Sequence, residues 1–293
     1  MTATIIDGNA IAQQVRDEVR ADIDRLRARG IEPGLAVVLV GENPASVSYV
    51  KGKAADALKI GMRSDTIRRP DTITQDELLR LIDGLNHDPA WHGIIVQLPL
   101  PKHIDESVIA SAVLPEKDVD GLHPVNVGRL FRGEPGFLSC TPHGVIQMLL
   151  RSGNDPAGKH VVVCGRSNLV GKPLVGLLIQ KRRGGNATVT VCHTGTPDLA
   201  EHTRRADILI AVMGRPLAIT AEMVRPGAVV IDVGVSAVPD ATKKRGTRLV
   251  GDVDFDAVAH IASAITPVPG GDGPMTRAML LYNTVLAASG GPR

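Results

Sequence analysis

The sequence contains little cysteine and few aromatic residues. Among its 293 residues are 3 Cys, 3 Phe, 2 Tyr and 1 Trp. The cysteines, Cys140, Cys164 and Cys192, lie far apart and form no C-x-x-C pair, which argues against a disulfide framework and against a cysteine-based metal or redox site. We expect buried, reduced thiols. The scarcity of aromatic rings also leaves few surfaces on which nucleic-acid bases could stack.

Neither sign of charge dominates, and long apolar runs are missing. The 33 basic and 31 acidic residues give a formal net charge of +2, whereas nucleic-acid-binding domains usually carry a clear basic excess. No apolar run approaches the roughly 20 residues that a membrane-spanning helix needs, and residues 1–9 lack the features of a signal peptide. We therefore predict a cytoplasmic protein that binds neither nucleic acid nor membrane.

Short runs rich in Val, Ile and Leu alternate with amphipathic stretches. The runs predict strands at residues 35–40, 93–98, 160–164, 188–192, 207–212 and 228–233, and the stretches predict helices at residues 11–28, 45–60, 74–85 and 275–288. Continuous apolar strands separated by helices are typical of a doubly wound parallel sheet in an α/β protein. Asn9 and Gly30 are predicted caps of the first helix, and Thr74 with Glu77 forms a predicted capping box.

The chain is long enough for two domains. A turn-rich break at residues 132–136 places the predicted boundary near residue 140. We predict an N-terminal α/β catalytic domain over residues 1–140, completed by a C-terminal helix at residues 274–293. Residues 141–273 should form a Rossmann-like, doubly wound parallel-sheet cofactor domain.

A glycine turn follows the predicted strand at residues 160–164. The segment 165–173 (GRSNLVGKP) leads into a helix, and such a turn brings backbone N–H groups and a helix N-terminus to a pyrophosphate. The G-x-x-x-x-x-G spacing departs from the usual fingerprint, so this motif alone leaves open a tight turn without a ligand. The candidate cofactor residues here are Gly165, Arg166, Ser167, Val170, Gly171 and Pro173.

The end of the next strand favours NADP over NAD. An NAD site often places an acid there, on the ribose 2′-hydroxyl, but this sequence has His193, Thr194 and Thr196. Together with Arg166, these side chains could donate hydrogen bonds to a 2′-phosphate. Gly214, Val233 and Gly234 follow later strands and are further cofactor candidates, although ordinary strand-to-helix turns would explain them equally well.

Tyr49 and Lys53 are four residues apart on a predicted helix and therefore share one face. Lysine can release a proton, which arginine cannot readily do, so Lys53 is a candidate for acid–base chemistry. The alternative is an exposed surface pair with no catalytic role.

Three further segments give these residues a context: 93–103 (GIIVQLPLPKH), 115–121 (PEKDVDG) and 265–276 (ITPVPGGDGPMT). Together with Tyr49-x-x-x-Lys53 and the turn at residues 165–167, and in this order, they resemble the bifunctional methylenetetrahydrofolate dehydrogenase/cyclohydrolase family over nearly the whole chain. The resemblance implies NADP-dependent oxidation of 5,10-methylenetetrahydrofolate to 5,10-methenyltetrahydrofolate, followed by hydrolysis to 10-formyltetrahydrofolate.

The resemblance also implies roles for particular residues. Lys53 would be the essential proton-transfer residue, Tyr49 would stack on the folate, Gln97 would hydrogen-bond Lys53, and Asp120 would anchor the pterin. The other implied substrate-binding residues are Gly270, Gly271, Asp272 and Pro274. The family commonly forms homodimers through the cofactor domain, and the active site should occupy a cleft between the domains. Nearby Asp118 is expected to be structural.

The clearest departure is Asp272, because the family loop usually has P-G-G-V-G-P. If this side chain faces folate, it could weaken binding or change the balance of the two activities. No metal site is expected, since His103, His123, His143 and His193 lack ligand spacing. A monofunctional dehydrogenase and a nucleotide-binding protein without turnover stay open as alternatives.

Overall fold

The computed structural model describes residues 2–243 and 246–292, and these divide into two compact units. The six-stranded unit comprises residues 1–12 and 141–276, and the three-stranded unit comprises residues 13–140 and 277–293. The predicted domains differ from these units at the N-terminus. Residues 1–12 belong to the six-stranded unit because the first strand, β1 (Thr4–Ile5), pairs with β11 (Ala264–Ile265).

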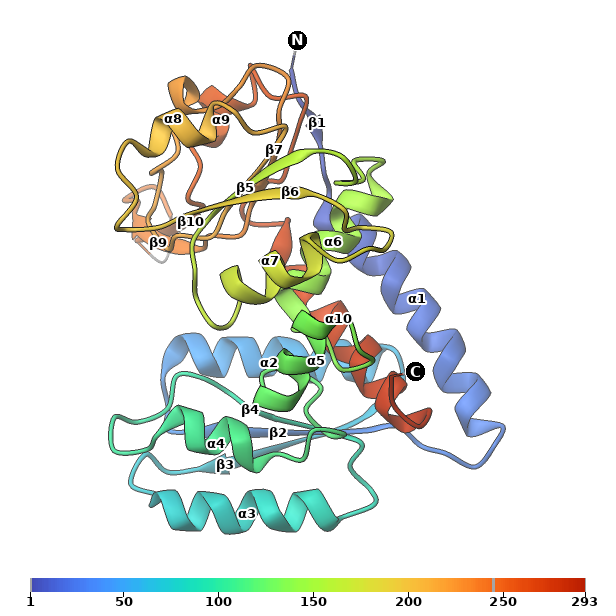
Figure 1. The fold of residues 1–293 in the computed structure, drawn as a ribbon. Helices are drawn as coiled ribbons and strands as arrows, with labels where there is room; N and C mark the ends of the chain where they lie inside the picture. Colours follow the sequence, from blue (N-terminus) through green and yellow to red (C-terminus); the bar gives the residue numbers. More distant parts are fainter. Residues whose placement is uncertain (1, 244–245, 293) are drawn as a thin grey trace. The chain divides into compact units, whose positions relative to one another are not determined.

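The six-stranded unit is built on a parallel sheet with the order β1-β11-β8-β7-β5-β6; Figure 1 labels β1, β7, β5 and β6 of this sheet. Its other strands are β5 (His160–Cys164), β6 (Thr188–Cys192), β7 (Ile208–Ala211) and β8 (Val229–Asp232). Each lies within a residue of its predicted position. From β5 the chain adds β6 on one side and β7 on the other, which makes the carboxyl end of β5 the topological switch point where ligands usually bind.

Short helices connect these strands. They are α6 (Cys140–Arg151), α7 (Gly171–Leu178), α8 (Leu199–Thr203), α9 (Phe255–Val258) and the 3-10 helix η1 (Ala221–Met223). The core on one face of the sheet is aliphatic, with Val162, Leu209 and Val230 fully buried. An antiparallel pair, β9 (Ser236–Pro239) and β10 (Thr247–Val250), was not predicted, because its residues are mostly exposed and show no apolar run.

The three-stranded unit has a parallel sheet of order β3-β2-β4. The central strand β2 (Gly34–Val40) is buried at every position, β4 (Gly93–Val96) lies on one side, and β3 (Arg63–Arg69) lies on the other. Strand β3 was not predicted because its sequence, RSDTIRR, is polar. Charged side chains of this kind are typical of an edge strand, where they oppose pairing with another sheet.

The helices of this unit include α2 (Pro44–Lys59), α3 (Gln75–His87), α4 (Glu106–Ala112) and α5 (Pro124–Arg132). Leu78, Ile82 and Ile109 bring α3 and α4 onto the sheet residues Val38 and Ile94. The capping box of Thr74 and Glu77 is confirmed at the start of α3.

Two long helices, α1 (Gly8–Arg27) and α10 (Asp272–Ala288), each contain a boundary between the units. The predicted cap of α1 was wrong, because Asn9 lies inside the helix and Asp7 Oδ1 accepts hydrogen bonds from the N–H groups of Asn9 and Ala10. Gly30 follows α1 with a φ of 76°, as a helix C-terminus favours. Helix α10 begins three residues earlier than predicted, since Pro274 is tolerated in a first turn.

Candidate functional site

A cavity of about 330 Å³ lies at the carboxyl ends of β5, β6 and β7, at the switch point of the six-stranded sheet. The predicted cofactor residues Gly165, Arg166, Ser167, His193 and Thr194 all line it. The other lining residues are Cys164, Cys192, Thr196, Leu199, Val212, Met213 and Arg215. Five predicted cofactor residues thus meet in one pocket, whereas Val170, Gly171, Pro173, Gly214, Val233 and Gly234 are not among its lining residues.

The two glycines of the turn after β5 are required by close backbone packing. A Cβ atom on Gly165 would lie 2.2 Å from the carbonyl oxygen of Val212, and one on Gly171 would lie 2.4 Å from that of Gly165. Ser167 Oγ accepts hydrogen bonds from the N–H groups of Val170 and Gly171. The seryl oxygen therefore satisfies the N–H of the first residue of α7 and fixes the turn that forms this wall of the cavity.

The charge of the cavity favours an anionic ligand. Arg166 and Arg215 line it, and none of its described lining residues is Asp or Glu. His193 Nδ1 accepts a hydrogen bond from the N–H of Gly195, so a neutral ring carries its proton on Nε2. The His193 N–H donates to Thr196 Oγ1, which shapes the loop after β6. The surroundings fit a phosphate-bearing nucleotide.

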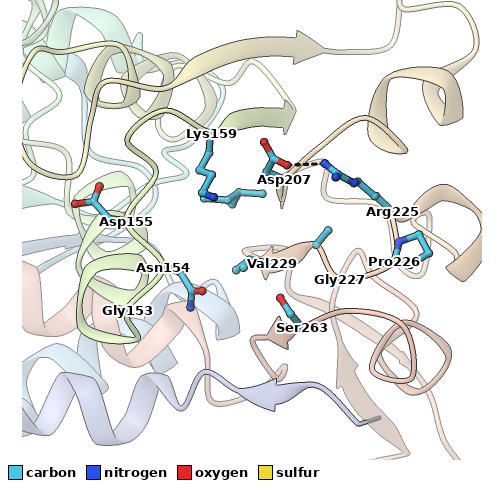
Figure 2. Close-up of a pocket in the computed structure, with 12 residues that line it drawn as sticks. Gly153, Asn154, Asp155, Lys159, Asp207, Arg225, Pro226, Gly227, Val229 and Ser263 are labelled. Carbon is cyan, nitrogen blue, oxygen red and sulfur yellow. Dashed lines mark hydrogen bonds and ion pairs between the residues drawn. The ribbon is translucent and has the colours of Figure 1, made fainter.

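A second cavity of about 330 Å³ lies at the opposite, amino-terminal edge of the same sheet (Figure 2). Its charged residues are largely paired or exposed: Asp207 forms an ion pair with Arg225 and also accepts a hydrogen bond from the N–H of His160. Asn154, Asp155, Lys159 and Ser263 are its other polar lining residues. Because ligands of open parallel sheets bind at the carboxyl ends of the strands, the cavity at Gly165 is the better candidate for the cofactor.

In the three-stranded unit, Lys53 is a buried lysine whose amine donates a hydrogen bond to a neutral amide. It lies on α2 with 8% of its surface exposed, and its Nζ donates a hydrogen bond to Gln97 Oε1 at 3.0 Å. Gln97 follows β4 and is held in turn, since its N–H donates to the Val38 carbonyl and its Nε2 donates to the Leu98 carbonyl. The amide group of Gln97 is thereby oriented to accept from Lys53.

Tyr49 lies one turn before Lys53 on α2 and is 45% exposed. An exposed ring beside a buried amine suits contact with a bound molecule. Asp120 is half-buried, and its charge acts on Cys140, whose thiol also feels Lys53. Burial is the largest cause that raises the pKa of the Cys140 thiol well above its ordinary value, and the charge of Asp120 is the next. The Cys140 Sγ donates a hydrogen bond to the carbonyl of Val119. The protonated thiol interacts with Asp120 and Lys53, and no sequence pattern predicted this arrangement.

The three cysteines are free and buried, as predicted. Asp118 is 4% exposed and accepts hydrogen bonds from the N–H groups of Leu122 and His123 and from Asn126 Nδ2. Burial raises the pKa of Asp118 to about 6 against the opposing effect of these donors. These contacts agree with a structural role for Asp118, which fixes the turn after Asp120.

The segment that contains Gly270, Gly271, Asp272 and Pro274 is tightly packed within the six-stranded unit. A Cβ atom on Gly8 would lie 1.9 Å from the carbonyl oxygen of Gly271, and Gly270 has a φ of 113°. Asp272 is 8% exposed, and its Oδ2 accepts a hydrogen bond from Thr276 Oγ1. Its side chain is therefore not on open solvent. Burial raises its pKa to about 7.

Two negative observations concern the described part of the chain. Over residues 2–243 and 246–292, the structure contains no group of three or more His, Cys, Asp or Glu side chains that could hold a metal ion. Within the same ranges, none of the helices has both the length and the apolar character to cross a membrane.

A nucleotide-type cavity on a doubly wound sheet and a buried lysine in a second α/β unit define a two-domain, cofactor-dependent enzyme. Comparisons identify the family. Residues 6–120 match the tetrahydrofolate dehydrogenase/cyclohydrolase catalytic domain, and residues 139–290 match the NAD(P)-binding domain of the same family. The chain belongs to this family, and the predicted resemblance, two-domain α/β fold and enzyme class are confirmed.

Individual relatives agree over their full lengths. The "Bifunctional protein FolD" of Chlorobium phaeovibrioides (strain DSM 265 / 1930) is 54% identical over 284 residues, 96% of each chain. The crystal structure of the bifunctional enzyme FolD from Campylobacter jejuni has a TM-score of 0.93 and 46% identity, covering 98% of this chain and 99% of that one. FolD from Trypanosoma brucei, solved with NADP and an inhibitor, has a TM-score of 0.93 and 41% identity, covering 99% and 98%.

Proposed function

We propose that this enzyme oxidises 5,10-methylenetetrahydrofolate with NADP, hydrolyses the methenyl product to 10-formyltetrahydrofolate, and uses Lys53 as the proton-transfer residue. The observation that carries the role of Lys53 is its burial with Gln97 Oε1 as its hydrogen-bond acceptor. A neutral amide oxygen, rather than a carboxylate, accepts this hydrogen bond from the buried amine.

The residues of the cavity at Gly165 fit NADP. Arg166 and Arg215 supply positive charge for phosphate groups, and His193 and Thr194 supply hydrogen-bond donors from the loop after β6. The bound nicotinamide would accept the hydride from the methylene carbon. The described lining lacks a carboxylate to repel a 2′-phosphate, which supports NADP rather than NAD.

Lysine suits the hydrolytic step better than arginine. Hydride departure leaves a cation stabilised by folate nitrogen, and a permanent positive charge beside it would oppose that charge. A neutral lysine accepts a proton from the attacking water and returns one to a folate nitrogen as the ring opens. Arginine keeps its charge and cannot exchange a proton in this way.

The remaining roles concern binding of the substrate. The exposed ring of Tyr49, one helical turn from Lys53, would stack on the folate, and the Asp120 carboxylate would accept two hydrogen bonds from the pterin edge. Gln97 would orient the Lys53 amine. Gly270, Gly271, Asp272 and Pro274 would complete the folate contacts, with Asp272 as the departure from the family pattern.

The test is a pair of assays on Lys53→Met: reduction of NADP with methylenetetrahydrofolate, and hydrolysis of methenyltetrahydrofolate without NADP. We expect hydrolysis to fall by at least about 100-fold, the lower range of a general acid–base contribution. Lys53→Arg should fail similarly despite its charge. The control is Lys51→Met, because Lys51 lies on the same helix but is exposed. Full hydrolysis by Lys53→Met would remove Lys53 from the mechanism, and inactivity of the wild type in both assays would refute the function.

We also propose a cytoplasmic homodimer. The edge strand β6 of the six-stranded sheet has an exposed Val191 and supports association through this unit. Size-exclusion chromatography with light scattering should give twice the chain mass of 30.9 kDa, and a monomer would refute the dimer.

A further inference from the structure

Asp252 is a buried carboxylate whose hydrogen bonds converge on one loop. It is 0% exposed. Its Oδ2 accepts from the N–H of Met213 at 2.5 Å and of Gly214 at 3.0 Å, and its Oδ1 accepts from the N–H of Arg215 at 2.8 Å. Three consecutive backbone donors after β7 thus point at a single side chain from 37 to 39 positions further along the chain.

This arrangement resembles an anion-binding nest filled by the protein itself. Gly214 has a φ of 63°, and a left-handed residue within such a run turns successive N–H groups toward one point. In many proteins a phosphate occupies that point. Here the three donors are committed to Asp252, so the N–H of Gly214 does not offer a hydrogen bond to a cofactor phosphate.

A second carboxylate fixes Asp252 in place. Asp232, the last residue of β8, accepts hydrogen bonds from the N–H groups of Asp252 and Val253 and from that of Gly234. Two glycines make room for the pair. A Cβ atom on Gly234 would lie 2.2 Å from Asp252 Cγ, and one on Gly251 would lie 1.8 Å from Asp232 Oδ2. The glycine in the D-V-G segment after β8 is therefore explained by Asp252, without a cofactor contact.

The loop held by Asp252 forms a wall of the candidate cofactor cavity, because Met213 and Arg215 both line it. We propose that Asp252 is a positioning residue of the dehydrogenase reaction, which holds residues 213–215 in the conformation that binds NADP. This inference rests on the proposed function. It predicts a separation of the two activities, since hydrolysis of methenyltetrahydrofolate uses no nicotinamide.

The experiment compares wild type with Asp252→Asn. An amide keeps the shape but offers one acceptor oxygen and places two N–H donors against backbone donors. We expect the KM for NADP, and the Kd for NADP measured by calorimetry without folate, to rise at least tenfold. The rate of methenyltetrahydrofolate hydrolysis, assayed without NADP, should stay within about twofold of wild type, because that reaction uses no nicotinamide. A tenfold rise in the Kd for NADP corresponds to about 1.4 kcal/mol.

Asp118→Asn is the matched control. Asp118 is also a buried carboxylate with three hydrogen-bond donors, but it lies in the three-stranded unit, so its loss should leave the Kd for NADP unchanged. Equal loss of both activities in Asp252→Asn, or an unchanged Kd for NADP, would overturn the inference. If the variant does not fold, Gly234→Ala, which presses a methyl group against the Asp252 carboxylate, should raise the same Kd. A wild type that binds NADP but reduces none would refute the proposed function and still leave the Kd comparison valid.

Discussion

Arg277 Nε donates a hydrogen bond to Asp56 Oδ2 at 2.6 Å, although 221 positions separate the two residues. Asp56 lies on α2, three residues after Lys53, and Arg277 lies on α10. The side chain of Arg277 also covers Gly52, where a Cβ atom would lie 3.5 Å from Arg277 Cδ. The pair thus ties the helix that carries Lys53 to the part of α10 that belongs to the same unit.

Arg277→Met should destabilise the protein. The side chain of Asp56 is 9% exposed and that of Arg277 is 30% exposed, so removal of the cation leaves a nearly buried carboxylate without its ion-pair partner. We expect a loss of about 2 kcal/mol in the free energy of unfolding, less than the full cost of a completely buried pair. Urea denaturation measures it.

The double variant Arg277→Met with Asp56→Asn serves as the control for this pair. Because it removes the uncompensated charge, it should regain part of the lost stability, and the double-mutant cycle then gives the coupling energy. Strictly additive losses would show that the ion pair does not couple α2 to α10.

Gln97→Met should impair proton transfer without affecting the cofactor. The substitution keeps the length of the side chain but removes the oxygen that accepts from Lys53 Nζ. We expect kcat for methenyltetrahydrofolate hydrolysis to fall about tenfold or more, a smaller loss than the roughly 100-fold expected when the acid–base group itself is removed, and the Kd for NADP to stay constant. Gln13→Met on the exposed face of α1 is the control. Unchanged hydrolysis in Gln97→Met would mean that Lys53 needs no orientation by this amide.

The sequence predicted the buried strands well, since a fully buried parallel strand is a continuous apolar run. It failed for β3, whose sequence is polar, for the pair β9 and β10, in which Val250 is the one buried residue, and for the two-residue strands β1 and β11. Such strands are stabilised by backbone pairing with a neighbour, which leaves no apolar pattern to detect.

The residues of the candidate site also divide into those that the sequence could predict and those that it could not. The residues around Gly165 could be predicted because the glycine turn, the strand end and the helix start are contiguous in sequence. Asp252 and Cys140 could not, because each acts through contacts with distant segments, Asp252 on residues 213–215 and Cys140 beside Asp120. An isolated acid or thiol carries no local pattern that distinguishes it from a surface or core residue.

Cofactor selectivity should depend on the two arginines of the cavity. Arg166→Gln and Arg215→Gln are each expected to raise the KM for NADP, with the larger effect, about tenfold, at the arginine that contacts the 2′-phosphate, because a charge-assisted bond is lost. In the variant of that arginine, the KM for NAD should change less than threefold relative to wild type. Steady-state kinetics with both cofactors measure the ratio. Lys172→Gln is the control, since Lys172 is exposed on α7 and does not line the cavity. If NADP and NAD are affected equally in both arginine variants, the preference has another origin.

Asp272 should make stability fall as pH rises. Its Oδ2 accepts from Thr276 Oγ1, while its buried Oδ1 has no hydrogen-bond partner among the described residues. Burial raises the pKa of this carboxyl from the ordinary value of 3.8 to about 7. Between these two values the folded state retains a proton that the unfolded state has released, so the free energy of unfolding decreases with rising pH across this window and the full penalty applies above it.

The variant Asp272→Asn cannot ionise and therefore escapes this penalty. We expect its free energy of unfolding, relative to wild type, to increase by about 2 kcal/mol or more between pH 4 and pH 8, since each unit of pKa shift corresponds to about 1.4 kcal/mol. Urea denaturation of both proteins at four pH values measures the difference. The pKa values of Asp118 and Asp232 are each raised to about 6. Both residues are present in both proteins, so their contributions to the pH dependence cancel in the difference. A difference that stays constant with pH would show that Asp272 ionises normally. In that case Asp272→Val should lower the free energy of unfolding at every pH, because the hydrogen bond between Thr276 Oγ1 and Asp272 is lost.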